Sequence, residues 1–267
     1  MIAVPPFPLP FDPTMAVLLI PLVGVALLAV LPFYRLGARL NVLLTFATLL
    51  SALYLLVERP PMGRYLFVDD LNVVFIVLGT FVGFTTSVFS ASYIGHELEI
   101  GRLTPANQRF YHAMYQALMF SMNLALLANN IGLMWVAIEL ATLTTVLMVG
   151  IYRTHEALEA AWKYFILGSV GIGLALFGTI LIYAAAQPVV GEGLDSMVWT
   201  KLVSAAAKFN PSILNLAFVF LLLGYGTKVG LVPMHAWLPD AHAEGPTPIS
   251  AVLSGLLLNV ALYAILR

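Results

Sequence analysis

The apolar stretch from Leu214 to His242 reads LNLAFVFLLLGYGTKVGLVPMHAWLPDAH, and it decides how this chain folds. It is long enough to cross a bilayer, because a transmembrane helix takes about twenty apolar residues. Glycine and proline interrupt it on both sides of Lys228, so we expect a broken transmembrane helix there. Irregular backbone at membrane depth is stable only where protein buries it or where it lines a watery cavity.

Lys228 is the residue in this stretch that points to a function. A charged side chain at the bilayer centre costs about 2.5–3.5 kcal/mol on insertion scales. A lysine near a helix end can avoid this cost by extending to the interface, but the nearest polar turns lie far from Lys228 on both sides. An ionisable group in a discontinuous helix is typical of ion-translocating membrane proteins.

Composition places the whole chain in a membrane and excludes several functions. Hydrophobic residues make up 61% of the 267 residues and charged residues only 9%, which indicates a polytopic membrane protein. A net charge of −1 offers no basic surface for nucleic acid. The chain has no cysteine, so it has no disulfide, thiolate metal site or iron–sulfur ligand. It also lacks the common hydrolase, phosphate-binding and zinc-protease motifs, so we expect no cofactor and no catalytic centre.

Polar turns divide the chain into about eight segments of membrane-spanning length. We therefore predict an all-α, polytopic transmembrane helical bundle. The segments lie near residues 14–34, 38–57, 71–94, 111–129, 131–152, 157–186, 212–239 (the broken one) and 247–266. The longest connection, 187–211, fits either a short amphipathic helix at the membrane interface or a solvated loop.

Small residues recur at helical spacing in two of these segments. The patterns are Gly79-x-x-x-Gly83 and Gly168-x-x-Gly171-x-Gly173. Glycine lets two helix backbones approach closely, and such patterns are common where transmembrane helices pack. We interpret both patterns as sites of helix packing.

Glu139 is a second ionisable residue at membrane depth. It lies eight residues after Ile131, about 12 Å along a helix. No cation lies one turn away on the same helix, so a partner must come from another segment, and Lys228 is the obvious candidate. At about 4 Å and an effective dielectric of 20, such a pair is worth about 4 kcal/mol. The pair could move a proton by forming and breaking, or it could be a static contact that fixes helix packing.

Three further residues are candidates for a polar path. Glu159 and Lys163 have the favourable i,i+4 order, so an interfacial salt bridge explains Lys163 without a further role. His235 and His242 are seven residues apart, about 10 Å on an ideal helix, which is too far to share one metal ion. We therefore expect no metal site. Neutral imidazoles suit a proton relay better.

A long motif begins at the broken helix. It reads K-x4-P-x-H-x-W-L-P-D-A-H over residues 228–242 and continues as EGPTPIS over 244–250. The motif resembles the signature of the antiporter-like membrane subunits of NADH–quinone oxidoreductases (the L, M and N types), Mrp-type cation/proton antiporters and membrane-bound hydrogenases. Glu139 and the run KYFI that starts at Lys163 also match. The run PTPISAVLSGLLLNVALYAILR, residues 246–267, most closely resembles the hydrogenase-4 type F subunit of formate-hydrogenlyase-like complexes.

This resemblance implies a proton channel. In such subunits, the spans that hold these residues form one half of an inverted repeat. By resemblance, Glu139 pairs with Lys228, and making or breaking that pair drives proton transfer. The same resemblance gives Lys163, His235 and His242 supporting or relaying roles.

The chain departs from the family pattern in two ways. Many members carry a lysine in the eighth span where Asn259 stands here, and asparagine cannot carry a proton charge. A relay through Asn259 would need water or another route, and hydrogenase-type members share this feature. The second departure is length: the resemblance implies a second repeat, which the 267 residues do not include, so we expect either a fragment or a half that a partner chain completes. We therefore expect N-terminal transmembrane helices 1–3 in residues 1–110 and the first antiporter-like repeat, helices 4–8, in residues 111–267.

These observations lead to one hypothesis and two alternatives. The hypothesis is a proton-translocating subunit, or its N-terminal half, that works with other membrane subunits of an oxidoreductase or hydrogenase complex in a prokaryotic cytoplasmic membrane. Electron transfer elsewhere in the complex would act on Glu139 and Lys228 electrostatically. The first alternative is a cation/proton antiporter or an inorganic-carbon uptake module without redox coupling, with sodium as a second candidate ion. The second alternative is a non-conducting membrane scaffold.

Overall fold

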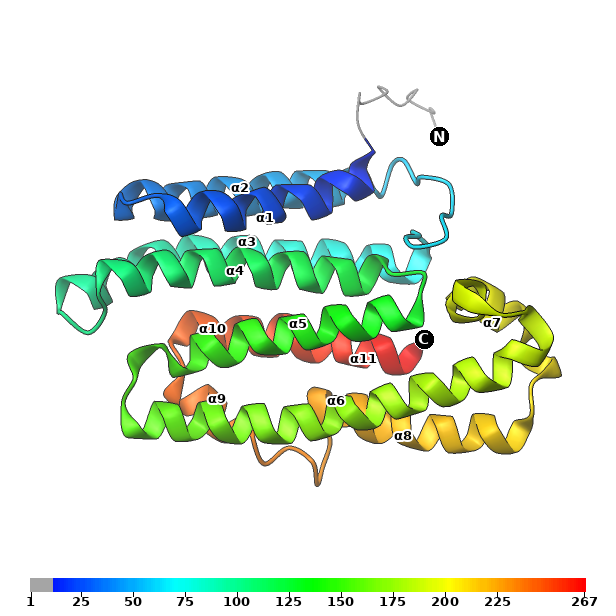
Figure 1. Cartoon of the computed structure of the whole chain (residues 1–267). Coiled ribbons are helices and arrows are strands. Elements are labelled where there is room, and N and C mark those ends of the chain that lie inside the picture. Colours follow the sequence, from blue (N-terminus) through cyan, green and yellow to red (C-terminus); the bar gives the residue numbers. More distant parts are fainter. Residues whose placement is uncertain (1–11) are drawn as a thin grey trace.

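The computed structural model describes residues 12–267, and within that range the fold is a helical bundle without strands (Figure 1). The helices stack in layers, with α1 and α2 on one side and α6 and α8 on the other. Their bounds are α1 (Pro13–Val30), α2 (Tyr34–Tyr54), α3 (Asp70–Glu99), α4 (Pro105–Leu127), α5 (Ile131–Val149), α6 (His155–Val190), α7 (Trp199–Ala205), α8 (Pro211–Val229), α9 (Leu238–Glu244), α10 (Thr247–Val252) and α11 (Leu258–Leu266). A π-helical turn, Leu253–Leu257, joins α10 to α11.

Seven helical segments in the described part of the chain are long and apolar enough to cross a membrane. They confirm the predicted polytopic bundle. The remaining predicted span, 111–129, forms α4 but is not one of the seven. Its buried residues include polar side chains such as Gln108, His112 and Gln116, because α4 packs against α1 and α5 inside the bundle. A helix in that position does not need an apolar surface all round.

Helix starts follow local sequence signals. Asp69 accepts hydrogen bonds from the backbone N–H groups of Leu71 and Asn72, and the side chain of Asn72 accepts from the backbone of Asp69. This reciprocal capping box opens α3. Elsewhere, Thr104 before Pro105 and Asn210 before Pro211 combine a side-chain N-cap with a proline in the first turn.

The helix pair α6 and α8 packs most closely around glycines. A Cβ on Gly171 would lie 2.7 Å from the Cβ of Thr227, and a Cβ on Gly224 would lie 2.4 Å from the backbone nitrogen of Ala175. Neither position has room for a side chain. The predicted packing role therefore holds for Gly171, whereas Gly173 faces open space.

The predicted break in the seventh span is present. Helix α8 ends at Val229, and Gly230 takes a left-handed conformation with φ 79° as its C-cap. Residues 231–237 are not helical, and α9 begins at Leu238. Figure 1 shows the break about midway between the two ends of the bundle. Glycine adopts this backbone conformation without the steric penalty of a Cβ, so the sequence ends the helix there.

The connection 187–211 was predicted to form either a short helix or a solvated loop, and it contains a short helix, α7 (Trp199–Ala205). Helix α7 lies at the end of the bundle beside the ends of α6 and α8 (Figure 1). Leu202 of α7 packs with Ile131, Ala186 and Phe209 in a small separate core. The connection is therefore fastened to the bundle by apolar contacts.

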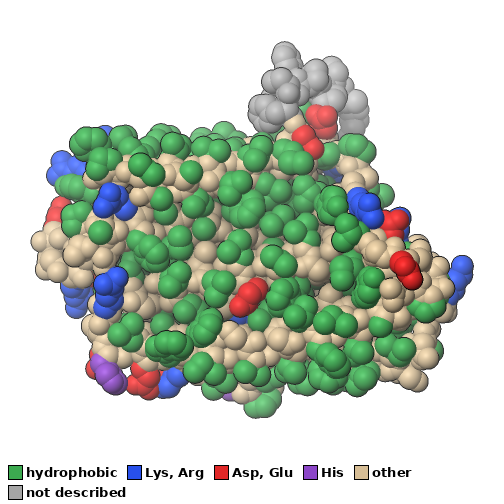
Figure 2. All heavy atoms as spheres, in the orientation of Figure 1, with side chains coloured by type: hydrophobic (Ala, Val, Ile, Leu, Met, Phe, Trp, Pro, Cys, Tyr) green, Lys and Arg blue, Asp and Glu red, His purple; other side chains and the backbone are tan. Residues whose placement is uncertain are grey.

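The surface agrees with a bilayer setting. Figure 2 shows hydrophobic side chains across the middle of one face, with most of the charged groups gathered toward the two ends of the bundle. The main core is continuous and includes residues from Val17 to Ala264. The helices before residue 111 therefore share a core with those after it.

Candidate functional site

Lys228 lies in the last turn of α8 and is fully buried. Its Nζ donates a hydrogen bond to Oγ1 of Thr142 on α5, at 2.7 Å. Thr142 in turn donates to the backbone oxygen of Ile138, at 3.0 Å. The amine of a lysine is thus held in the protein interior against a neutral hydroxyl.

Aromatic rings form the wall beside this ammonium group. Nζ of Lys228 lies 5.6 Å from the centroid of the Tyr164 ring, within the range of a cation–π contact. Tyr164 stacks on Trp237 with centroids 4.4 Å apart and an interplanar angle of 17°. The Tyr164 hydroxyl lies 2.7 Å from Oγ1 of Thr145, and Nε1 of Trp237 donates to the backbone oxygen of Thr227 at 2.8 Å. The first bond joins α6 to α5, and the second fastens the broken segment to the end of α8. Ring stacking holds Trp237 of the broken segment against α6.

Gly168 of α6 lies directly against Lys228. A Cβ at this glycine would lie 2.7 Å from Nζ of Lys228, so no larger residue fits without moving the ammonium group. The predicted packing glycine is therefore also a wall of the lysine site.

Glu139 lies one turn before Thr142 on α5 and is half-buried. Its Oε2 atom is buried and has no hydrogen-bond partner among the described residues. Within residues 12–267, no carboxylate oxygen lies within 4.0 Å of Lys228 Nζ, so Lys228 and Glu139 form no direct ion pair.

Lys163 lies on the exposed surface of α6. Its Nζ contacts Glu159 at 2.7 Å and Asp240 of α9 at 2.8 Å. The predicted i,i+4 pair with Glu159 therefore forms. Successive residues of a helix point in directions about 100° apart, and it is the next residue, Tyr164, that faces Lys228.

His235, His242 and Asn259 make no hydrogen bond to Lys228 in the described structure, and Asn259 lies on α11 facing α3 and α4. His235 is in the non-helical segment, and its Nδ1 is buried without a partner in the described range. His242 is half-buried on α9, and its backbone oxygen accepts from Ser250. Asn259 donates to the backbone of Gly255 at 2.8 Å. No group of three side chains that could hold a metal ion occurs in residues 12–267.

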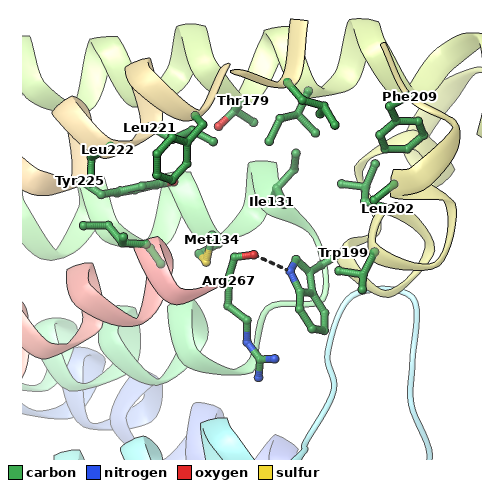
Figure 3. Close-up of a pocket in the computed structure, with 17 residues that line it drawn as sticks. Ile131, Met134, Thr179, Trp199, Leu202, Phe209, Leu221, Leu222, Tyr225 and Arg267 are labelled. Atoms are coloured by element: carbon green, nitrogen blue, oxygen red, sulfur yellow. Dashed lines mark hydrogen bonds between the residues drawn. The ribbon is translucent and has the colours of Figure 1, made fainter. Parts of the chain in front are cut away.

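A separate apolar cavity of about 370 Å³ lies among α5, α6, α7, α8 and α11 (Figure 3). Trp199 stands at its edge and donates from Nε1 to the backbone oxygen of Arg267, at 3.1 Å. Tyr225, one turn before Lys228 on α8, is part of its lining. The lining is almost entirely apolar, so this cavity does not extend the polar site.

Sequence reasoning missed Tyr164, Trp237 and Gly168 as parts of the lysine site. Tyr164 and Trp237 stand inside the two motifs that carry the resemblance, and Gly168 stands inside a pattern interpreted as packing. Their identity as neighbours of Lys228 depends on which face of α6 meets α8. A single apolar helix does not reveal that orientation, because it is hydrophobic on every side.

A bundle of membrane-spanning helices with a buried lysine beside a break in one of them defines a class of antiporter-like membrane subunits. The chain belongs to the family described as NADH:quinone oxidoreductase/Mrp antiporter, TM, whose model matches residues 128–267.

One curated relative is the hydrogenase-4 component F homolog of Methylacidiphilum infernorum, 64% identical over 252 residues. That match covers 94% of this chain and 53% of the relative, and this chain spans about half the length of the curated relatives it matches. Among solved structures, a chain of an archaeal respiratory complex, the membrane-bound sulfane sulfur reductase, has a TM-score of 0.82 at 22% identity, covering 95% of this chain and 52% of that one. A chain of respiratory complex I from Thermus thermophilus has a TM-score of 0.74 at 26% identity, with coverage of 94% and 52%.

Proposed function

We propose that this chain is a proton-translocating membrane subunit, or the N-terminal half of one, in a respiratory-type oxidoreductase complex. Lys228 carries the proton, and Glu139 acts as its charge partner. The observation that supports this most is Lys228 itself, a fully buried ammonium group whose hydrogen bond goes to the hydroxyl of Thr142. Burial of a charge is costly without a charged partner, so such a group is rarely retained for packing alone.

The proposed movement is a change of partner on α5. Glu139 and Thr142 are three residues apart, so both lie on one side of that helix. In this proposal the flexible side chain of Lys228 turns from the hydroxyl toward the carboxylate while α8 stays in place. A carboxylate stabilises a nearby ammonium group more than a hydroxyl does. A change of partner would therefore alter how readily Lys228 releases its proton.

The other predicted site residues keep their proposed roles. Lys163, His235 and His242 support or relay proton movement, and Asn259 takes part through water because its amide cannot be charged. We also propose that residues 111–267 form the first antiporter-like repeat and that residues 1–110 contribute the three helices before it. The hydrogen bond from Trp237 to Thr227 and the hydroxyl contact between Thr145 and Tyr164 support a site organised within the later part of the chain.

We further propose that the chain works beside other membrane subunits in a hydrogenase-4-type complex. Its relative in Methylacidiphilum infernorum is named as a hydrogenase-4 component F homolog, at 64% identity. Large apolar side chains such as Val136, Leu147 and Phe177 are exposed along the sides of the bundle. Such a surface suits lipid and neighbouring membrane helices.

The test uses the complete complex reconstituted in liposomes. Redox-driven proton uptake is compared for the wild type and for Lys228→Ala, with electron transfer measured in the same preparation. We expect electron transfer to continue while proton uptake is lost or strongly reduced. Lys208→Ala is the matched control, because it removes an exposed lysine and should change neither rate.

Unchanged proton uptake in an assembled Lys228→Ala complex would contradict the proposal and would make the buried lysine a structural residue. Glu139→Gln gives a second measure, because it removes the charge of the proposed partner and keeps the shape of the side chain. Uptake driven by a sodium gradient, without any redox reaction, would favour an antiporter outside a redox complex.

A further inference from the structure

A second group of buried polar side chains lies away from Lys228, on the face of α4 that meets α1 and α2. Gln108, His112 and Gln116 follow one another at intervals of four residues, so they form one stripe along α4. All three are at most 2% exposed. Figure 1 shows α1 and α2 as the layer that covers this side of α4. This stripe, with Asn41 of α2 opposite Gln116, is called the α4 seam below.

The hydrogen bonds of the α4 seam are incomplete. Both ring nitrogens of His112 have no partner in the described structure, and neither do Oε1 of Gln108, Oε1 of Gln116 and Nδ2 of Asn41. Each of these atoms is buried. A buried polar atom without a hydrogen bond costs about 1–3 kcal/mol, and native proteins satisfy nearly all such atoms with protein or ordered water. Five of them on one seam therefore indicate a bound polar partner, and three of the five belong to Gln108 and His112.

The seam contains space for that partner. A cavity of about 10 Å³ lies where α4 meets the α1–α2 connection, lined by Tyr34, Gly37, Gln108, Arg109 and His112 together with apolar side chains. One water molecule needs roughly 10–15 Å³ by this measure and two to four polar partners. The partnerless atoms of Gln108 and His112 can supply them.

A chain of hydrogen bonds continues from the seam toward the middle of the membrane. Nε2 of Gln116 donates to Oδ1 of Asn41 at 2.9 Å, and Thr45 donates to the backbone oxygen of Asn41 at 3.0 Å. Oγ1 of Thr45 then lies 2.7 Å from Oγ of Ser87 on α3. From Tyr34 to Thr45 the helix rises about 16 Å, roughly half the thickness of a bilayer core.

We propose that the α4 seam is a water-binding site, in which ordered water in the cavity bridges His112 to Gln108. The seam is then a hydrated polar inlet that runs from the Arg109 end of the bundle to the Thr45–Ser87 pair. It is separate from the Lys228 site and does not depend on the function proposed for that site. Water is the fitting ligand because the partnerless atoms include both donors and acceptors and the cavity has the size of one water molecule.

The first test is hydroxyl-radical labelling of the intact wild-type complex by a pulse of X-rays, which produces radicals from bound water inside a protein. His112 should be labelled although it is only 2% exposed. Tyr115 is the control on the same helix, because it is equally buried and its hydroxyl donates to Gly83 at 2.6 Å. Labelling of His112 at least severalfold above that of Tyr115 is the expected result, and equal protection of both would overturn the proposal.

The second test compares His112→Asn with His112→Leu by thermal unfolding of the same complex. The two new side chains have the same branching and nearly the same size, so they leave similar space and differ in hydrogen bonding. In a hydrated seam the Asn variant should unfold at the higher temperature, because its amide keeps the contact with water. A higher unfolding temperature for the Leu variant would mean that the seam is dry. The thermal comparison requires that both variants fold. The labelling test uses only the wild-type complex, so it does not depend on either variant.

Discussion

At the scale of single residues, the polar contact of Lys228 is with one turn of α5. Lys228 donates to the Thr142 hydroxyl, and the Glu139 carboxylate lies one turn away. The lysine has little freedom on its other sides, where Gly168 and Tyr164 contact it. Small changes in those walls should therefore act on the position of the ammonium group.

Gly168→Ala should displace Lys228 without unfolding the bundle. The added Cβ would lie 2.7 Å from Nζ, which is the mobile end of a flexible side chain. We expect the hydrogen bond to Thr142 to be weakened, at a cost of about 1.5–3 kcal/mol for a bond to a charged group. Proton uptake by the reconstituted complex should fall. Gly173→Ala is the control, because its Cβ meets nothing within 4 Å and alanine favours a helix by about 1 kcal/mol over glycine. A fall of the same size in both variants would show that the effect is not local.

The Asp69–Arg267 pair should make stability depend on pH. Burial opposes ionisation of Asp69, but hydrogen bonds from Arg267 and from the backbone of Asn72 and Leu71 lower the pKa of this carboxyl below its usual value. Arg267 donates to both carboxylate oxygens, at 2.6 and 2.7 Å. A lowered pKa means that the stabilisation is complete at neutral pH and is lost as pH falls below about 4, through the folded-state value.

Asp69→Asn removes the negative charge of residue 69 but keeps an N-cap for α3, because asparagine is also a good N-cap residue. At pH 7 we expect the variant to be less stable by about 1–2 kcal/mol, between the values for exposed and buried pairs. Thermal unfolding of both proteins from pH 7 to pH 3 should show the difference closing on the acid side. A difference that stays constant with pH would mean that the loss comes from capping.

At the scale of elements, the break after α8 puts the end of a helix inside the membrane. Gly230 closes α8 in a left-handed conformation, and Trp237 donates to the backbone oxygen of Thr227, one of the last carbonyls of that helix. The last backbone carbonyls of a helix have no partner within the helix, so they need such donors when water is absent. The break is therefore held by specific contacts and is not a loose hinge.

Replacing Gly230 should cost stability according to how well the new residue accepts a positive φ. Gly230→Val should destabilise the protein by about 1–2 kcal/mol, because a Cβ clashes in the left-handed region. Gly230→Asn should cost less, since asparagine visits that region more readily. Thermal unfolding of the two variants beside the wild type measures the order. Equal losses of stability in the two variants would show that the close contact with Leu238, 3.3 Å from the added Cβ, matters more than the positive φ of residue 230.

At the scale of the whole molecule, the sides of the membrane on which the helix connections lie show whether α4 crosses it. Helix α4 is too polar to be one of the seven apolar spans, yet it runs between the two ends of the bundle beside α3 and α5 (Figure 1). If α4 crosses, the α3–α4 and α5–α6 connections lie on the same side of the membrane. If it does not, they lie on opposite sides.

Single cysteines can test this directly, because the chain has none of its own. Glu99→Cys, Glu156→Cys and Glu192→Cys each replace an exposed residue at an end of the bundle. We expect a membrane-impermeant maleimide to label Glu99→Cys and Glu156→Cys from one side and Glu192→Cys from the other. Opposite labelling of the first two would mean that α4 does not cross.

The sequence by itself was enough for the class of fold. Apolar segments of membrane-spanning length, polar turns and capping residues are local signals, and they predicted the helical bundle and the break at Lys228. The family followed from a long motif around that break. The predicted span 111–129 forms helix α4, but α4 is too polar to be one of the seven apolar spans, so its crossing of the membrane stays a prediction.

Only the tertiary structure decided which side chains meet. An apolar helix has no preferred face, so the sequence could not tell that Tyr164 rather than Lys163 points at Lys228, or that Thr142 rather than Glu139 accepts its hydrogen bond. It also could not tell that Gln108, His112 and Gln116 meet α1 and α2 away from lipid. In a membrane protein the rotation of each helix is set by close packing against its neighbours, and that packing exists only when the bundle is assembled.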